Sequence, residues 1–225
     1  MVLRNVEETS AGIYKITPDN APAFSVRLLY LENLKPERLV PVDVPLSQSD
    51  SLFMPVTDLE GGKPGVLTDE ESQDLLHASL VFAAEVAAMS YLSRAEQSRA
   101  GLTKKLSAKG IDTGISSLAL DYLESVDFLS DRRFAGAWLR TRSIDHAEGR
   151  KRLSAELAAR GISREDAKYA LDEYFSEHSE RSLCERALRK IRRTRGNLDS
   201  QKVYASLLRS GFSSSTIKAT MSEES

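Results

Sequence analysis

Basic side chains are concentrated in two segments of this chain, and guanidinium groups spaced along a helix can bind phosphates or carboxylates. The segment "RSLCERALRKIRRTRG", residues 181–196, contains seven Lys/Arg. If it is helical, Leu183, Ala187, Leu188 and Ile191 form an inward stripe and leave the cations outward. The candidate partner-binding residues of this segment are Arg181, Arg189, Lys190, Arg192, Arg193 and Arg195.

A second basic cluster precedes it in the chain. Its candidate partner-binding residues are Arg132, Arg133, Arg140, Arg142, Arg150, Lys151 and Arg152. Two clusters at corresponding places in adjacent repeats favour a shared binding role, while solvated helix faces remain the alternative. Several weak contacts to phosphates along a nucleic acid, or to an acidic groove of a protein polymer, would act together. Sequence-specific base reading is not expected, because zinc-finger, RNP and zipper patterns are absent from the sequence.

Residues that could do acid, base or metal chemistry are scattered. His77, His146 and His178 lie far apart and form no HExxH or similar arrangement. GxSxG and Walker patterns are absent, and in "LEGGKPGV" Pro64 stands where a phosphate loop has Ser or Thr. We therefore expect a protein that is not an enzyme and has no cofactor and no metal site.

Three other side chains are better explained as core residues. Cys184 is the one cysteine, so it cannot form an internal disulfide, and we expect it to be a small buried side chain. Trp138 and Tyr174 could stack on bases, but they lie on apolar helix faces, where core packing is the more frequent role.

A repeated, glycine-jointed unit must position the basic segments. Gly110, Gly161 and Gly211 are separated by 51 and 50 residues, a period typical of stacked supersecondary units. The apolar residues around the glycines have matching spacing. They are Leu102, Leu106, Ile111 and Leu120; Leu153, Leu157, Ile162 and Leu171; and Val203, Leu207, Phe212 and Met221. We expect three helices in each repeat, because a helix of about 12 residues is not stable alone in water.

The middle repeat indicates where the helices begin and end. Its first helix is predicted over 131–142 and its second over 147–160, with Gly161 in the left-handed C-cap conformation. Ser163 with Asp166 opens the third helix. The buried stripe of that helix is expected to be Ala167, Ala170, Leu171 and Tyr174.

The N-terminal region has strand chemistry. "GIYKI" and "FSVRLLYL" are rich in β-branched and aromatic residues, and "ERLVPVDVPL" suggests an edge strand because of its prolines. We predict a small antiparallel sheet over roughly residues 11–60, a turn at 59–66, and a capping box of Thr68 with Glu71 that opens a long helix. The fold class is mainly α, with tandem three-helix repeats in an elongated array after a small antiparallel β-containing region. The expected domains are 1–68, the β-containing region; 69–128, a linker helix and the first repeat; 129–178, the second repeat; and 179–225, the third repeat.

Charge is divided unequally between these parts. Residues 1–77 hold 6 Lys/Arg and 13 Asp/Glu, a balance of −7, whereas residues 78–225 hold 25 and 20, a balance of +5. The two parts are expected to meet different surroundings. The start lacks the pattern of a secretory signal, and no apolar run approaches the roughly 20 residues of a membrane helix. A cytoplasmic, monomeric protein without membrane contact is expected.

Four segments, in their order and spacing, resemble the RecX family of bacterial recombination regulators. They are "YLSRAEQSRAGLTKKLSAKGI" (91–111), "DRRFAGAWLRTRS" (131–143), "GRKRLSAELAARGI" (149–162) and "LLRSGF" (207–212). The resemblance covers roughly residues 80–223. Residues 131–135 match the acid-basic-x-aromatic-Ala signature of the family. The second helix of the family pattern is matched by Gly149, Arg152, Leu153, Leu157 and Gly161.

The resemblance implies a protein that binds the RecA recombinase, lies along the groove of its nucleoprotein filament, and modulates filament growth, usually by inhibition. The expected processes are DNA recombination, DNA repair and the SOS response. Members of the family can also contact DNA, single- or double-stranded. Two alternatives are a sequence-nonspecific nucleic-acid-binding helical repeat protein without a recombinase partner, and a helical scaffold for an unrelated protein.

Overall fold

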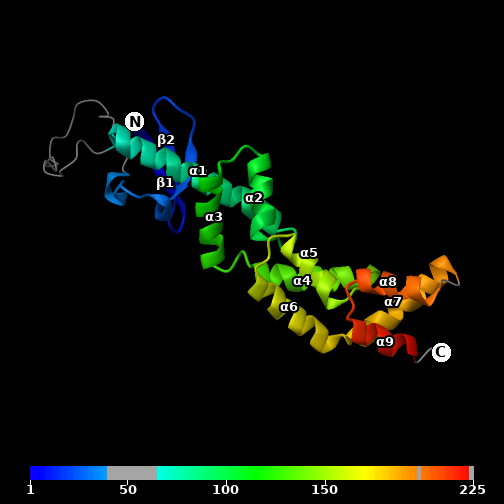
Figure 1. Ribbon diagram of the computed structural model, residues 1–225. Helices are drawn as coiled ribbons and strands as arrows, with labels where there is room; N and C mark the ends of the chain where they lie inside the picture. Colours follow the sequence, from blue (N-terminus) through cyan, green and yellow to red (C-terminus); the bar gives the residue numbers. More distant parts are fainter. Residues whose placement is uncertain (40–64, 197–198, 223–225) are drawn as a thin grey trace, which may run out of the picture. The chain divides into compact units, whose positions relative to one another are not determined.

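A small sheet opens the chain. The computed structural model describes residues 1–39, 65–196 and 199–222 (Figure 1). Strands β1 (Leu3–Ser10), β2 (Ile13–Pro18) and β3 (Phe24–Arg27) form an antiparallel sheet in that order. The register pairs Ile16 with Val6 on one side and with Phe24 on the other. The prediction of a small antiparallel sheet is confirmed.

The limits of the sheet differ from those expected. β1 begins at Leu3, ahead of the predicted start at residue 11. The segment after β3 bends into a short 3-10 helix, η1 (Leu28–Tyr30), and a second one, η2 (Pro36–Arg38), follows. The predicted edge strand at 37–46 and the turn at 59–66 fall largely on residues 40–64, which lie outside the described part of the chain.

The rest of the described chain is mainly helical. The helices are α1 (Asp69–Leu92), α2 (Arg99–Ala108), α3 (Thr113–Ser125), α4 (Asp131–Asp145), α5 (Arg150–Ala158), α6 (Arg164–Glu177), α7 (Glu180–Arg195), α8 (Ser200–Arg209) and α9 (Ser214–Ser222). The predicted capping box opens α1. The N–H of Thr68 donates to Oε2 of Glu71 at 2.8 Å, and the N–H of Glu71 donates to Oγ1 of Thr68 at 3.2 Å.

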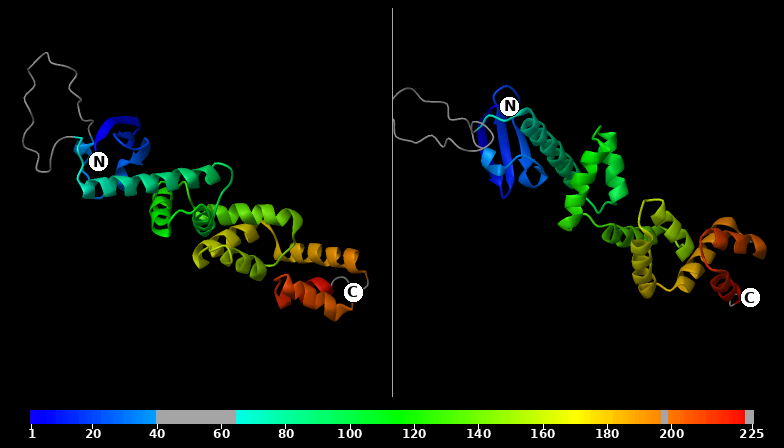
Figure 2. Two further views of the ribbon diagram at one scale, coloured as in Figure 1. Left: turned by 90° about the horizontal axis from the view of Figure 1, so that it is seen from above. Right: turned by 60° about the vertical axis from the view of Figure 1, so that its left-hand side comes forward.

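Two compact units are formed, which we call unit 1 (Met1–Ala88 and Gly110–Asp121) and unit 2 (Met89–Lys109 and Tyr122–Ser225). In unit 1 the sheet lies against α1, as Figure 2 shows, and their shared core includes Leu3, Ile16, Val26 and Leu75. Burial of these side chains supplies the main attraction between sheet and helix.

Three acidic side chains of α1 anchor the N-terminal region by hydrogen bonds. Glu71 receives two bonds from the guanidinium of Arg38, at 2.9 and 3.0 Å. Glu85 receives bonds from Arg27 and from the hydroxyl of Tyr30, the latter at 2.7 Å. Asp74 accepts from three consecutive backbone N–H groups at positions 32–34. Glu71 is half-buried and the other two acids are buried, and all three carboxylates are hydrogen-bonded, as buried polar groups generally are.

α1 departs from the expectation that no segment is long and apolar enough to cross a bilayer. It has 24 residues and contains a window of mean hydropathy 1.5, and 33% of that window is buried in the structure. Its buried face carries Asp74 and Glu85, which accept hydrogen bonds from the N–H of Leu34 and the hydroxyl of Tyr30 in the segment after the sheet.

In unit 2, helices α4, α5 and α6 are followed by α7, α8 and α9 around one continuous core. The predicted stripe of α6 is buried, and so are Leu153, Leu157, Val203, Leu207 and Phe212. Ser163 caps α6 by accepting from the N–H of Asp166 at 3.0 Å. Gly161 has a φ of +81°, the left-handed conformation that was predicted, and Gly211, for which no such prediction was made, has a φ of +88°.

Each glycine turn in unit 2 also touches the start of an earlier helix. The hydroxyl of Ser98, which caps α2, donates to the carbonyl of Arg160 at 3.1 Å, next to Gly161. The N–H of Gly149, which caps α5, donates to the carbonyl of Ser210 at 2.9 Å, next to Gly211. The same joint is therefore used twice along the unit.

Candidate functional site

The structure divides the candidate cations into two groups. The first group forms ion pairs within unit 2. The pairs are Arg132–Asp166, Arg133–Glu96, Arg133–Asp127, Arg142–Glu148, Arg150–Asp172, Arg152–Glu148 and Arg181–Glu185. Most of the upstream cluster is thus paired with acids of the same chain.

Arg133 is the clearest example of a structural cation. Its guanidinium donates to Glu96 at 2.9 Å and to the carbonyls of Asp127 and Phe128 at 2.9 and 3.1 Å. The hydrogen bond to Glu96 raises the pKa of Arg133, with a further contribution from Asp127. This residue joins the start of α4 to the turn that precedes it and to the link between α1 and α2.

Glu148 is the hub of a second structural network. It is buried between α4 and α5 and accepts from Arg142 at 2.8 and 3.1 Å and from Arg152 at 2.7 Å. Desolvation alone would raise the pKa of Glu148, but the hydrogen bonds from Arg142 and Arg152 outweigh it and lower the pKa. The carboxylate therefore stays ionised and fixes the link between the two helices.

The second group of cations faces outward. Arg140, Lys151, Arg189 and Arg193 are exposed, and each has no carboxylate partner within the described residues. Arg192 is also exposed, on α7. Arg195 ends α7, and its side chain lies outside the described part of the chain. The predicted inward stripe of α7 is buried at Leu183, Ala187 and Leu188 and half-buried at Ile191.

Two cations of α7 lock this helix onto the end of α4. Arg186 donates to the carbonyls of Ser143 and His146, both at 2.7 Å, and Lys190 donates to the carbonyl of Asp145 at 3.2 Å. These oxygens lie at the C-terminal end of α4, which carries partial negative charge. Arg186 was not singled out by the sequence, because only its position opposite a helix end reveals its role.

Together these residues form a basic groove between the α4–α5 link and α7. Its volume is about 520 Å³, and its lining comprises Ile144, Asp145, Ala147, Arg186, Arg189, Lys190 and Arg193. The side chain of Ile144 is 76% exposed at the rim. We call this surface the α7 basic groove. It offers fixed cations beside an apolar contact, the arrangement expected for an anionic macromolecular partner.

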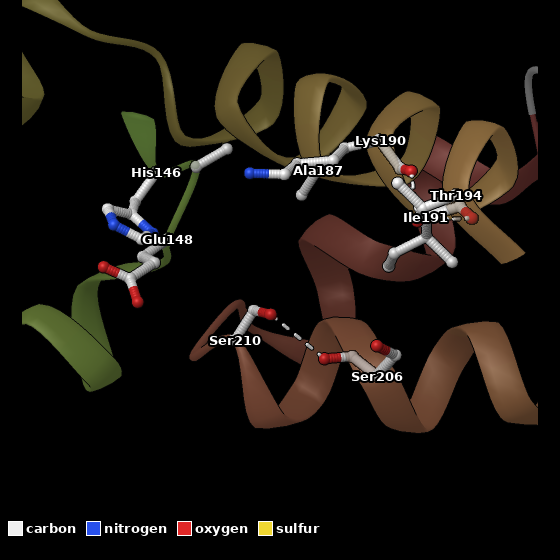
Figure 3. Close-up of a pocket in the computed structure, with 9 residues that line it drawn as sticks. His146, Glu148, Ala187, Lys190, Ile191, Thr194, Ser206 and Ser210 are labelled. Atoms are coloured by element: carbon white, nitrogen blue, oxygen red, sulfur yellow. Dashed lines mark hydrogen bonds between the residues drawn. The ribbon is translucent and has the colours of Figure 1, made fainter. Parts of the chain in front are cut away.

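A smaller cavity of about 240 Å³ lies between the same link, α7 and α8 (Figure 3). Figure 3 shows His146 and Glu148 on the link, Lys190, Ile191 and Thr194 on α7, and Ser206 and Ser210 on α8. The hydroxyl of Ser210 donates to the carbonyl of Ser206 at 3.1 Å. Among the described residues, neither serine hydroxyl bonds to the His146 ring, so the cavity does not assemble a nucleophile with its base.

The remaining candidates lie where the sequence placed them. Cys184 is buried, and burial raises the pKa of its thiol, which keeps it protonated and unreactive. Tyr174 is buried and stacks on His178 with ring centroids 4.5 Å apart. Trp138 is half-buried, with the guanidinium groups of Arg160 and Arg142 at 4.4 and 5.6 Å from its ring centroid. Both aromatic rings are therefore engaged within the unit.

Comparison with known proteins gives consistent results. A family model described as RecX, second three-helix domain, matches residues 130–171. Regulatory protein RecX of Treponema pallidum is 36% identical over 157 residues, which is 70% of this chain and 94% of the relative. Regulatory protein RecX of Geobacillus thermodenitrificans is 26% identical over 167 residues, 72% of this chain and 62% of the relative.

Solved structures show the same fold. A crystal structure of regulatory protein RecX has a TM-score of 0.72 at 21% identity and covers 99% of this chain and 100% of that chain. A crystal structure of RecX from Lactobacillus salivarius has a TM-score of 0.56 at 23% identity and covers 65% of this chain and 97% of that chain. The fold is that of a helical-repeat protein with a small N-terminal sheet. Because it is 36% identical to its Treponema relative over 70% of its length, this chain belongs to the RecX family.

Proposed function

We propose that this chain is a non-enzymatic, monomeric cytoplasmic regulator that binds the RecA recombinase in its nucleoprotein filament and inhibits recombination and DNA repair by that filament. The observation that carries the proposal is the α7 basic groove. Arg189 and Arg193 have no carboxylate partner among the described residues and stand on a helix fixed to α4 by Arg186 and Lys190. Family membership supports the regulatory role.

The proposed mechanism is binding without catalysis. Repeats 129–178 and 179–225, taken as separate domains, would each make a modest contact with the filament. Because the repeats are covalently linked, the second contact forms at high effective concentration. Contacts that cross subunit boundaries would bias the filament conformation or obstruct its growing end. The name of the relatives, regulatory protein, supports a role of this kind.

The test is charge reversal on the outward face of α7. The double variant Arg189→Glu/Arg193→Glu should bind RecA-coated single-stranded DNA at least about tenfold more weakly, because each reversal replaces attraction by repulsion. The matched control is Lys202→Glu/Lys218→Glu, which makes the same change of charge at exposed positions of α8 and α9. Unchanged binding by the α7 variant, with normal circular dichroism, would remove the groove from the proposal.

Nonspecific nucleic-acid binding without a recombinase is the second candidate function, and the spacing of the α7 cations favours it as an alternative. Residues four apart on a helix are about 6 Å apart along its axis, close enough for successive phosphates of one strand. Binding of naked duplex DNA would then weaken with salt at a log-log slope near −0.9 per phosphate contact. Equal affinity for naked and RecA-coated strands would favour this alternative.

A further inference from the structure

A second concave basic site lies in unit 2, away from the α7 basic groove. It is a pocket of about 580 Å³ between α5, α6 and the turn that joins α8 to α9. Its cationic lining comes from Arg150, Lys151, Arg164 and Lys168, and its apolar lining includes Leu171. Arg164 and Lys168 were not among the residues indicated by the sequence, because the pocket exists only where α5 packs beside α6.

The charges in this pocket do not balance. Asp172 pairs with both Arg150 and Lys168, the latter at 3.2 Å. Hydrogen bonds from these two cations lower the pKa of Asp172, so its carboxylate remains ionised. Lys151 and Arg164 are exposed, and neither has a carboxylate partner among the described residues.

The one carboxylate in the lining is already used within the fold. Oε1 of Glu180 accepts from the N–H of Arg150 at 3.2 Å, and Oε2 accepts from the hydroxyl of Thr216 at 3.3 Å. Glu180 therefore ties α7 to α5 and α9. The pocket keeps a net positive charge toward solvent, carried by Lys151 and Arg164.

We propose that this pocket binds an acidic peptide segment of a partner protein, with one apolar side chain of the peptide inserted and flanking carboxylates paired with Lys151 and Arg164. Concavity and an apolar floor suit an inserted side chain flanked by polar contacts. A nucleic-acid strand fits less well. Single strands bound without sequence preference are held by a positively charged groove together with aromatic stacking platforms, and the described lining has the cations but no aromatic side chain. This inference goes beyond the proposed function and uses a different set of residues.

The probe is a fluorescein-labelled peptide, Asp-Glu-Asp-Leu-Asp-Glu-Asp, whose fluorescence anisotropy is measured with the full chain. Its affinity should fall at least about tenfold when the central Leu is replaced by Ser, because burying a leucine side chain is worth about one to two powers of ten in affinity. Equal binding of the two peptides, or no binding of either, would overturn the proposal.

The variant Lys151→Glu/Arg164→Glu should weaken peptide binding about tenfold or more, whereas Lys202→Glu/Lys218→Glu should leave it unchanged. Arg189→Glu/Arg193→Glu should also leave it unchanged, so failure of the α7 basic groove and failure of this pocket give different results. If a single-stranded oligonucleotide displaces the peptide, and Lys151→Glu/Arg164→Glu weakens both equally, the pocket belongs to a phosphate-binding surface and the peptide proposal is wrong.

Discussion

Gly149 and Gly211 lie backbone against backbone, at the point where the start of α5 meets the turn between α8 and α9. A Cβ atom on Gly149 would lie closer than 3.0 Å to the carbonyl oxygen of Gly211. A Cβ atom on Gly211 would in turn approach Arg152 closer than 3.0 Å. Close approach of two backbones explains why both positions are glycine, and it fixes the third repeat to the second.

Substitution of these glycines should therefore loosen the joint. Gly149 has φ −83°, so Gly149→Ala introduces only a clash, with an expected cost of about 1–3 kcal/mol from overpacking. Gly211→Ala adds left-handed strain to a clash and should cost more. Chemical denaturation would measure both changes in the free energy of unfolding.

Gly110→Ala is the matched control for strain. Gly110 is the equivalent glycine of the first repeat, it has φ +81°, and nothing lies within 4 Å of a Cβ built there. The strain alone should cost about 1–2 kcal/mol. If Gly211→Ala were no more destabilising than Gly110→Ala, close packing at the joint would not contribute to stability.

Local chemistry explains which parts of the fold the sequence revealed. Helix ends were predictable where the capping interaction joins residues only a few positions apart in the chain. This holds for Thr68, Ser163 and the glycines at 161 and 211. β1 was missed because its side chains are exposed apart from Leu3, which is buried, and Val6, which is half-buried, so it lacks an alternating pattern.

The candidate site was only partly predictable, because pairing depends on tertiary contacts. The exposure of Arg189 and Arg193 follows from the periodicity of α7. By contrast, Arg133 pairs with Glu96 and Arg150 pairs with Asp172, partners that lie 37 and 22 residues away in the chain. A count of basic residues cannot show which of them are already neutralised.

Glu148 should make the stability of unit 2 depend on pH in the acid range. Its pKa in the folded chain is lowered, so its contribution is complete above the usual glutamate pKa and is lost as pH falls through the lowered value. Glu148→Gln should cost about 1–3 kcal/mol near neutral pH, because two cations lose a charged acceptor. The free energy of unfolding of the variant should also fall less steeply on acidification than that of the unmodified chain. Thermal melts at several pH values would measure this difference.

Glu156→Gln is the comparison for Glu148. Glu156 is half-exposed and pairs with Arg160 at 2.8 Å and with Arg152 at 3.7 Å. Partly exposed pairs of this kind contribute about 0–1 kcal/mol. A cost at Glu148 no larger than the cost at Glu156 would contradict the role of Glu148 as the hub of the network.

Asp74 should hold the segment after the sheet against α1. Its carboxylate accepts from the N–H groups of Asn33 at 2.9 Å and Leu34 at 2.8 Å, and also from Glu32. Desolvation would raise the pKa of Asp74, but these backbone hydrogen bonds outweigh it and lower the pKa. Asp74→Ala should cost about 1–3 kcal/mol and speed hydrogen exchange of the three amides.

Glu70→Ala serves as the control for Asp74, since Glu70 is an exposed acid in the first turn of α1. This variant should leave exchange at positions 32–34 unchanged. If the amides at 32–34 stayed protected from hydrogen exchange in Asp74→Ala, a contact other than Asp74 would hold this segment against α1.

Ser116 should be a position where removal of a polar group stabilises the chain. It lies in α3 and is 1% exposed, and its hydroxyl has no hydrogen-bond partner among the described residues. A buried hydroxyl without a partner costs about 1–3 kcal/mol, and alanine is also the better helix former. Ser116→Ala should raise the free energy of unfolding by about 1 kcal/mol or more.

The exposed helical residue Ser107 separates the buried-hydroxyl penalty from helix propensity, since Ser107→Ala gains only the helix propensity. A gain at Ser116 no greater than that at Ser107 in thermal melts would mean that the buried hydroxyl carries no penalty.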